Sequence, residues 1–158
     1  TSIHLIMMSA MRLVKFFPSN GIKESNVNEY NQQTVTEIER IRDFVILHYH
    51  ATQRDDTDFW RYCKNMDIPE ALAHRVQLFK DTAAIALEEK ELFLNDSWVQ
   101  VMMGQGIMPT SYHPIADVMD EMELKNFLGY LKKSVGEKVA AMPSHQELIN
   151  RYCKAPAM

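Results

Sequence analysis

The amino-acid sequence predicts an all-α fold, and three observations support this prediction. Apolar residues recur at steps of three and four along most of the chain, which is the spacing of one face of a helix. Alternating apolar and polar runs, which are typical of strands, are short, and no Asn-Gly or Asp-Gly turn joins two such runs. The chain has 158 residues, of which 46% are hydrophobic, so it is long enough for a helical domain with a core.

The N-terminal third of the sequence predicts two helices. The first covers residues 3–17, and Pro18 ends it because proline cannot continue a helix. The second covers about 25–50, with Ser25 or Asn26 as its N-cap. The opposite face to its apolar one carries two charge pairs at i,i+3 spacing, Glu37–Arg40 and Glu39–Arg42. The expected apolar face consists of Val27, Tyr30, Thr34, Ile38, Ile41, Val45 and either His48 or Tyr49.

Shorter elements are predicted in the middle of the chain. The polar residues 52–58 predict a turn before a short helix over 59–64. Pro69 stands at the first-turn position of a further helix, where its missing N–H costs no hydrogen bond. Residues 83–97 leave helix and loop open, and 104–114 predict a loop because they hold two Gly and two Pro. The helix after Pro69 is expected to bury Leu72, Val76 and Phe79.

Two helices are predicted at the C-terminal end. Residues 117–142 follow a long amphipathic pattern that Pro143 ends. Ser144 and Glu147 have the spacing of a capping box, so a last helix is expected to run to about Cys153. The apolar face of the long helix would carry Leu124, Phe127, Leu128, Leu131, Val135, Val139 and Met142.

Composition and charge argue against several classes of protein. A dinucleotide-binding turn needs G-x-G-x-x-G and a phosphate loop needs G-x-x-x-x-G-K-[ST]; the chain has only 5 glycines, and the pair Gly104 and Gly106 completes neither motif. The net charge is -4 and the basic residues are scattered, so we expect no nucleic-acid partner. No apolar run approaches the ~18 residues of a membrane span, so we expect no membrane partner.

The cysteines and histidines do not form a metal motif. Cys63 and Cys153 lie outside any C-x-x-C pair, and we expect two buried or partly buried thiols in a reducing cytoplasm. His48 and His50 are two residues apart, so on a helix they point about 200° apart and do not share a face as metal ligands would. Residue chemistry alone therefore indicates a soluble helical domain without a metal.

Several longer blocks of sequence occur in a characteristic order. They are TSIHL, NEYN, ERIRDFVILHYHATQRDD, FWRYC, ELFLNDSWVQVMMGQGIMP, SYHPIAD and AAMPSHQELI. Together they resemble the C-terminal part of the flavin-dependent tryptophan halogenases. The resemblance implies that residues 1–158 are the helical, substrate-pocket part of such an enzyme, packed on a flavin-monooxygenase-like α/β domain that lies upstream. The glycine-rich flavin turn and the catalytic Lys and Glu belong to that upstream part in the family.

The resemblance also implies a reaction, namely halogenation of an indole-like or other electron-rich aromatic. In the family, reduced FAD, oxygen and a halide ion such as chloride give a hypohalous oxidant, which travels to the aromatic ring in a second pocket. The implied cofactors are FAD, reduced by a flavin reductase, and the halide, and the implied partners are that reductase and a small aromatic substrate. A homodimer is left open. The 158-residue chain alone, without the glycine-rich turn and the Lys, is expected to be inactive.

Three residues at the start of the chain match the halide and flavin positions of the family. Thr1 and Ser2 match the two positions whose backbone N–H groups hold the halide. The start of a helix suits an anion, because unpaired N–H groups and the positive end of the helix dipole face it. Ile3 matches a residue that packs near the flavin ring.

A second group of residues matches the substrate positions of the family. These are Glu88, Leu92, Phe93 and Ser97. The pair of Tyr that tryptophan-specific members carry is replaced here by Asp81 and Thr82. A tryptophan ammonium and carboxylate would then be poorly held, so the resemblance points to free indole or another electron-rich aromatic, with Phe93 stacking on the ring.

Two other interpretations remain open at this stage. One is a non-catalytic helical interaction domain, and the other is part of a different flavin monooxygenase. A Glu-Ser pair directly before Thr1 and a Trp-x-Trp-x-x-Pro motif farther upstream would favour the halogenase.

Overall fold

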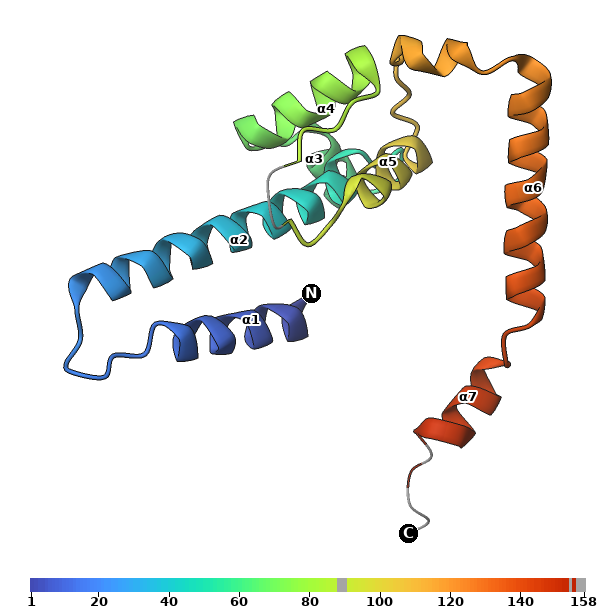
Figure 1. Ribbon diagram of the computed structural model, residues 1–158. Coiled ribbons are helices and arrows are strands. Elements are labelled where there is room, and N and C mark those ends of the chain that lie inside the picture. The colour runs from blue at the N-terminus through green and yellow to red at the C-terminus, as the bar shows by residue number, and fades with distance from the viewer. Residues whose placement is uncertain (88–90, 154, 156–158) are drawn as a thin grey trace. The chain divides into compact units, whose positions relative to one another are not determined.

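The computed structural model describes residues 1–87, 91–153 and 155, and every regular element in this part of the chain is a helix (Figure 1). The all-α prediction is therefore confirmed. The chain divides into two compact units, Thr1–His113 and Pro114–Met158, each with its own helices. Of the helices that are described, none is long and apolar enough to cross a membrane.

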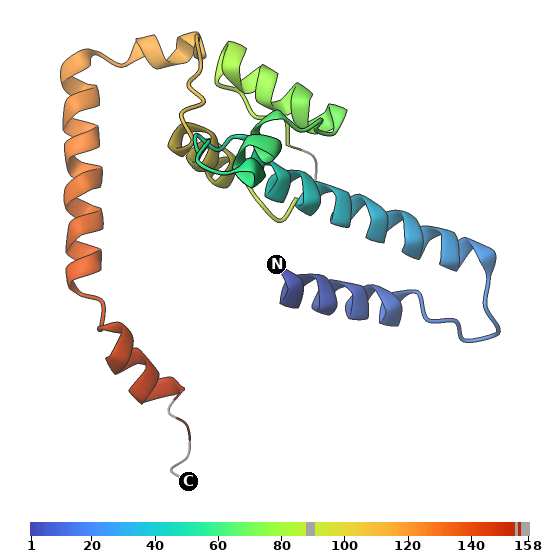
Figure 2. The same ribbon diagram turned by 180° about the vertical axis from the view of Figure 1, so that it is seen from behind.

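A hairpin of two helices opens the first unit. α1 (Ser2–Lys15) lies beside α2 (Glu24–His50), and the two run in opposite directions (Figures 1 and 2). The predicted cap of α2 is wrong, because the helix begins after Lys23. The Asn26 side chain instead donates to the carbonyl oxygen of Phe16 across the connection, at 3.1 Å, and so ties the two helices of the hairpin together.

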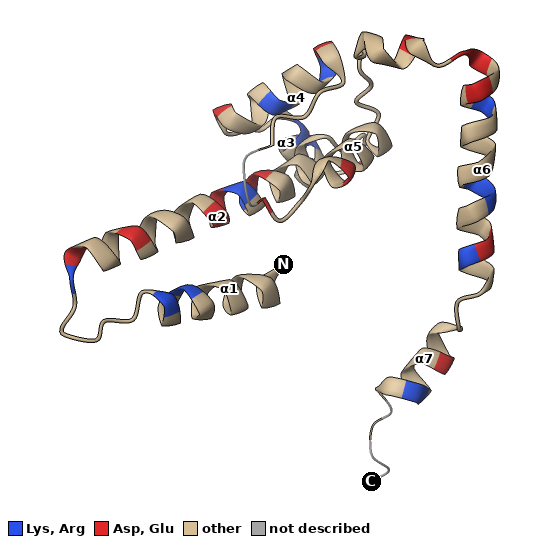
Figure 3. Ribbon diagram, in the orientation of Figure 1, with Lys and Arg blue, Asp and Glu red and all other residues tan. Residues whose placement is uncertain are grey.

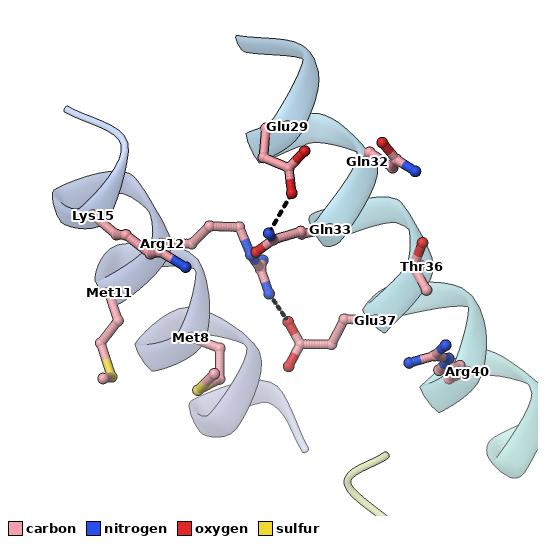
Figure 4. A pocket seen from close by; sticks show the side chains of 10 residues that line it. All are labelled: Met8, Met11, Arg12, Lys15, Glu29, Gln32, Gln33, Thr36, Glu37 and Arg40. Carbon is pink, nitrogen blue, oxygen red and sulfur yellow. Dashed lines mark hydrogen bonds and ion pairs between the residues drawn. The ribbon is translucent and has the colours of Figure 1, made fainter. Parts of the chain in front are cut away.

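Polar side chains join α1 to α2. The Arg12 guanidinium donates to a carboxylate oxygen of Glu37 at 2.5 Å and to the Thr34 hydroxyl at 2.9 Å. His4 Nε2 lies 3.1 Å from the other Glu37 oxygen. The sequence placed Glu37 beside Arg40 on a polar outer face, whereas the structure directs its carboxylate at α1 (Figure 4). The predicted pair Glu39–Arg42 is present, at 3.4 Å.

The core of the first unit lies around the C-terminal half of α2. Helices α3 (Asp58–Asn65), α4 (Glu70–Thr82) and α5 (Asn95–Gly104) contact this half. The predicted apolar face of α2 is largely wrong, since Ile38 and Val45 are exposed and only Ile41 of that stripe is buried. The buried side of α2 differs from the predicted one because α1 contacts one side of the helix and α4 and α5 contact another. The core consists of Phe44, Leu47, Leu72, Val76, Phe79, Trp98 and Met102.

Local signals set the ends of the shorter helices. Thr57 caps α3, and its hydroxyl accepts from the backbone N–H of Trp60. Pro69 is the N-cap of α4 rather than its first helical residue. Of the segment left open, residues 84–87 and 91–94 are irregular, and α5 begins at Asn95. Gly106 has φ +84°, and a Cβ there would collide with the Gln53 side-chain amide, which donates to the carbonyl of Gln105 at 2.9 Å.

The second unit contains a short 3-10 helix, η1 (Pro114–Val118), followed by α6 (Glu121–Ala140) and α7 (His145–Tyr152). α6 begins later than predicted because the Asp120 carboxylate accepts from the N–H groups of Met122 and Glu123. The capping box of Ser144 and Glu147 is confirmed. Acidic residues begin α6 and basic residues follow along it (Figure 3), as the helix dipole favours.

Side chains of the second unit are much less buried than those of the first unit. Among its described residues none is buried, and the predicted apolar stripe of α6 is exposed, with Val139 and Met142 at 60% and 67%. Cys153 is also exposed, which corrects the prediction of a buried or partly buried thiol, whereas Cys63 in the first unit is buried.

Candidate functional site

A pocket of about 490 Å³ joins residues that are far apart in the sequence. It lies between the start of α1, the C-terminal half of α2, α3 and the segment before α5. Thr1, from the predicted halide position, and Phe93, from the predicted substrate position, both line it. The other lining residues are Phe44, Val45, His48, Tyr49 and Trp60, so none of the described residues around this pocket is Lys, Arg, Asp or Glu.

Phe93 is held in the pocket wall by two aromatic neighbours. Its ring stacks on that of Phe44, with the centroids 3.9 Å apart and the planes 21° from parallel. The indole N–H of Trp98 donates to the carbonyl oxygen of Phe93 at 3.2 Å, and the Trp98 ring meets Phe44 edge-on at 4.8 Å. Because Trp98 is 1% exposed, both the ring and the backbone of Phe93 rest on the core.

A buried ion pair fixes the chain just before Phe93. The Arg75 guanidinium of α4 donates to both carboxylate oxygens of Glu91, at 2.6 and 3.1 Å. The two side chains are 13% and 3% exposed, and the guanidinium also lies 4.3 Å from the centre of the Trp98 ring. A buried charge is tolerated only when it is paired, so this contact holds residues 91–93 against α4 and α5.

Two further residues of the pocket wall are also aromatic. The rings of Tyr49 and Trp60 lie nearly parallel, with centroids 6.0 Å apart. The Arg54 guanidinium covers Trp60 at 4.6 Å and is itself held by both oxygens of Asp56, at 3.0 and 2.7 Å. The hydrogen bond from Arg54 lowers the pKa of Asp56, and the same bond raises the pKa of Arg54. Residues 53–58 of the polar turn are exposed, and the ion pair with Asp56 holds the Arg54 cation against the Trp60 ring.

His48 has a defined tautomer. Its ring nitrogen Nδ1 lies 2.7 Å from the carbonyl oxygen of Phe44, one turn earlier in α2. A carbonyl can only accept, so Nδ1 carries the proton in the neutral ring. Nε2 is then left as a hydrogen-bond acceptor.

The other described residues that were predicted at the site do not line this pocket. Ser2 and Ile3 begin α1, with Ile3 75% exposed, and neither lines this pocket. Leu92 lines a small neighbouring depression beside Ile41. Ser97 lies half-buried in the first turn of α5, and Glu88 lies outside the described residues. Their functional assignments stay predictions.

Sequence reasoning missed most of the pocket wall. Phe44 and His48 are one helical turn apart, as are Val45 and Tyr49, so each pair shares a face of α2. That spacing was visible, and Val45 with His48 or Tyr49 was placed on an apolar face that should pack inward. The structure shows instead that this face borders a cavity. Nothing in the spacing indicates that Trp60, after the polar turn, completes the wall.

A larger depression of about 540 Å³ runs between α1 and α2 (Figure 4). Met8 and Met11 of α1 form one side, and Glu29, Gln33 and Glu37 of α2 lie on the other. Its Arg12 is already bonded to Glu37, and Gln33 donates to Glu29 at 2.6 Å, so these polar groups satisfy one another. In the part of the chain that the structure describes, no group of three or more His, Cys, Asp or Glu could hold a metal ion.

Comparison with known proteins identifies relatives of the chain. A family model described as tryptophan halogenase matches residues 1–121. A tryptophan 7-halogenase of Kutzneria sp. (strain 744) is 22% identical over 168 residues, covering 96% of this chain and 32% of its own length. The chain thus spans about a third of the length of the curated relatives that it matches over nearly its whole extent.

Solved structures agree with this result. A flavin-dependent halogenase from Xanthomonas campestris shares 48% identity with a TM-score of 0.92, over 99% of this chain and 31% of that one. A flavin-dependent halogenase from Brevundimonas sp. BAL3 shares 35% identity with a TM-score of 0.88, over 95% of this chain and 30% of that one. The family model covers well over half of the residues, and the chain therefore belongs to the tryptophan halogenase family.

Proposed function

We propose that the chain is the C-terminal, helical part of a flavin-dependent halogenase that modifies an indole-like or other electron-rich aromatic. Residues 1–158 would form the substrate-pocket region and pack on an upstream flavin-binding domain. The observation that carries the proposal is the pocket in which Thr1 and Phe93 meet. In this proposal the halide is held at one end of the pocket and the aromatic ring at the other.

The chemistry of the pocket wall favours a neutral aromatic substrate. Phe44, Tyr49, Trp60 and Phe93 offer ring faces and edges for stacking. A tryptophan substrate carries an ammonium and a carboxylate, and burying such charges without partners is unfavourable. Since none of the described lining residues is charged, the wall supports free indole or a comparable aromatic better than the amino acid. Leu92 and Ser97 would then belong to a second layer around Phe93.

The start of α1 supplies the groups that an anion needs. The first helical residue is Ser2, and Thr1 is the N-cap, whose carbonyl accepts from the N–H of Leu5 at 3.0 Å. The backbone N–H groups between Thr1 and Leu5 come before this first intrahelical hydrogen bond, so they are available to a halide. Thr1 and Ser2 would hold the halide through their backbone, so their side chains matter less than the helix start itself.

The chain offers one contact to the flavin. FAD, when bound in its reduced form, supplies the oxidising chemistry together with oxygen. Ile3 is apolar and 75% exposed at the start of α1, which fits a residue that packs against a flat ring system. The catalytic Lys and Glu and the glycine-rich turn are proposed to lie in the upstream part.

The proposed enzyme depends on partners that the chain itself does not supply. A flavin reductase would deliver reduced FAD, and the pair would work in the cytoplasm. We further propose that two copies associate as a homodimer. Size-exclusion chromatography with light scattering tests this last point, since a monomeric mass would exclude it.

The proposal is tested with the intact protein expressed from the reading frame that contains this chain. Flavin reductase, FAD, oxygen and either chloride or bromide are added to a panel of indoles, phenols and tryptophan. We expect halogenated indole by mass spectrometry, and no product from the 158-residue chain alone. Turnover by the isolated chain would contradict the division of roles, and an inactive intact protein would favour a non-catalytic helical domain.

Phe93→Ala provides the sharper test of the pocket. We expect the KM for indole to rise about fivefold to tenfold, because a stacking contact contributes on the order of 1 kcal/mol beyond area burial and part of the ring's own area is lost. Flavin binding should change little. Phe17→Ala is the matched control, since Phe17 is 70% exposed in the α1–α2 connection and does not line this pocket. An unchanged KM for Phe93→Ala would remove Phe93 from the substrate site.

A further inference from the structure

We infer that His48 determines substrate specificity, by accepting a hydrogen bond on Nε2 from the ring N–H of the aromatic bound in the pocket. The inference rests on the proposed function, because it takes the occupant of the pocket to be an aromatic substrate. It adds a residue and a role: the pocket would select rings that carry an N–H or O–H donor and orient them through that donor.

The hydrogen bond to the Phe44 carbonyl fixes the tautomer of His48. The 2.7 Å contact between Nδ1 and the Phe44 carbonyl assigns the ring proton to Nδ1. Nε2 is on the far side of the ring from this carbonyl, so it faces away from the bond that orients the imidazole. Within the described residues no hydrogen bond to Nε2 is present. An acceptor with a fixed direction is therefore available to a ligand.

The imidazole ring of His48 borders the proposed substrate site. His48 lines the same pocket as Thr1 and Phe93, so its ring and the stacking surface of Phe93 belong to one cavity. The imidazole meets the Phe44 ring edge-on at 4.8 Å, and Phe44 in turn stacks on Phe93. These two ring contacts hold His48 and Phe93 in a fixed relation, which is what a site needs to bind a flat ring and orient it at once.

Other side chains of the pocket wall also carry polar groups. The hydroxyl groups of Thr1 and Tyr49 both donate and accept, and the indole of Trp60 only donates. Among the described residues that line the pocket, His48 Nε2 is thus the side-chain group that accepts without also donating. A ligand N–H meets a matched partner there, whereas a ring that lacks the donor leaves the imidazole nitrogen unpaired, and such mismatches are the strong source of specificity in binding sites.

The inference is tested by equilibrium binding to the intact, flavin-free protein. Indole and N-methylindole are titrated into the wild type and into His48→Phe, which keeps a ring and removes the acceptor, and binding is followed calorimetrically. We expect the wild type to bind indole roughly fivefold more tightly than N-methylindole, the gain expected of one neutral hydrogen bond. In His48→Phe this preference should vanish, with the affinity for N-methylindole unchanged.

Two further variants keep the test decisive. His48→Gln places an amide oxygen near the position of Nε2 and should restore most of the preference for indole. His74→Phe makes the same substitution at an exposed position of α4 and should leave both affinities unchanged. A purely structural role of His48 would lower the affinity for both ligands equally, and that result would overturn the inference.

The outcomes separate this inference from the proposed function. If the intact protein halogenates indole and His48→Phe keeps the preference for indole over N-methylindole, the role of His48 is wrong and the proposed function stands. If neither indole binds nor halogenated product forms, the proposed function fails and the inference fails with it.

Discussion

The two halves of α2 are held by different kinds of contact. The N-terminal half meets α1 through Glu37, whose carboxylate bonds to Arg12 and approaches His4. The C-terminal half is embedded in apolar contacts, with Leu47 fully buried and Phe44 packed against Trp98. One continuous helix thus leads from a polar helix pair into the core of the unit.

This difference shows where the packing of the described residues is complete. Around Leu47 the side chains pack against one another, and Arg75 and Glu91 form an ion pair at the edge of the core. Along α1 no described residue is buried, and Ile6 and Val14 remain 69% and 77% exposed. Apolar residues at helical spacing that stay exposed mark a surface made to pack against something else, which agrees with the proposal of an upstream domain.

Removal of the Trp98 side chain should cause the largest loss of stability, in the core around the C-terminal half of α2. Trp98→Ala deletes the ring that supports Phe44, Phe93 and Arg75, and a buried Trp-to-Ala change costs about 4 kcal/mol of unfolding free energy. We expect hydrogen exchange in the intact protein to accelerate across the C-terminal half of α2, α4 and α5. Trp60→Ala, at the more accessible tryptophan, should destabilise much less. Equal losses for the two variants would contradict the assignment of the core.

The polar pair between α1 and α2 should have a smaller and local effect. Arg12→Met leaves the half-buried Glu37 carboxylate without its charged partner, and a hydrogen bond to a charged group contributes about 2 kcal/mol. We expect amide exchange in α1 to rise by roughly 30-fold, while exchange around Leu47 stays unchanged. Hydrogen-exchange mass spectrometry on the intact protein resolves the two regions.

Lys15→Met is the matched control for this variant. Lys15 is also a cation of α1, but its ammonium lies over the Phe16 ring at 5.1 Å and it is exposed. Lys15→Met should leave the amide exchange rates of α1 within about twofold of the wild type, as expected for an exposed surface substitution. If Arg12→Met and Lys15→Met behave alike, the contact to Glu37 does not hold the hairpin together.

The helices were predictable from the sequence because their ends depend on nearby residues. α1 ends at Lys15 and α6 at Ala140, each shortly before the proline expected to end it, and Ser144 with Glu147 begins α7. The faces were not predictable in the same way. Ile38, Ile41 and Val45 share a stripe on α2, yet only Ile41 is buried, because burial depends on where α1, α4 and α5 contact the helix. Spacing within one helix carries no information on that choice.

In the candidate site, too, some residues could be predicted from the sequence and others could not. The resemblance to the halogenase family singled out Thr1 and Phe93, and the structure brings both to one pocket. His48, Tyr49 and Trp60 were missed because a wall is formed by residues from separate elements, and nothing local to each of them signals a cavity. Arg75 and Glu91 were likewise unpredictable as a pair, since the contact joins α4 to an irregular segment 16 residues later.

The smallest effect is expected at α7, where neither a core nor a bond to another helix of its unit is described. The Ser144 hydroxyl and backbone N–H donate to the Glu147 carboxylate, both at 2.7 Å, and the hydroxyl bond is the main cause that lowers the pKa of Glu147 below its ordinary 4.5. A lowered folded-state pKa means that the stabilisation is fully present above 4.5 and is lost as the pH falls through the folded value. Exchange of the α7 amides should therefore accelerate relative to the intrinsic rate in that acidic window. In Ser144→Ala the hydroxyl bond is lost while the backbone N–H of residue 144 still donates to Glu147, so the Glu147 pKa should return part of the way toward 4.5 and the acid-dependent step should become smaller. An identical acid step in both proteins would show that α7 is held by contacts other than its cap.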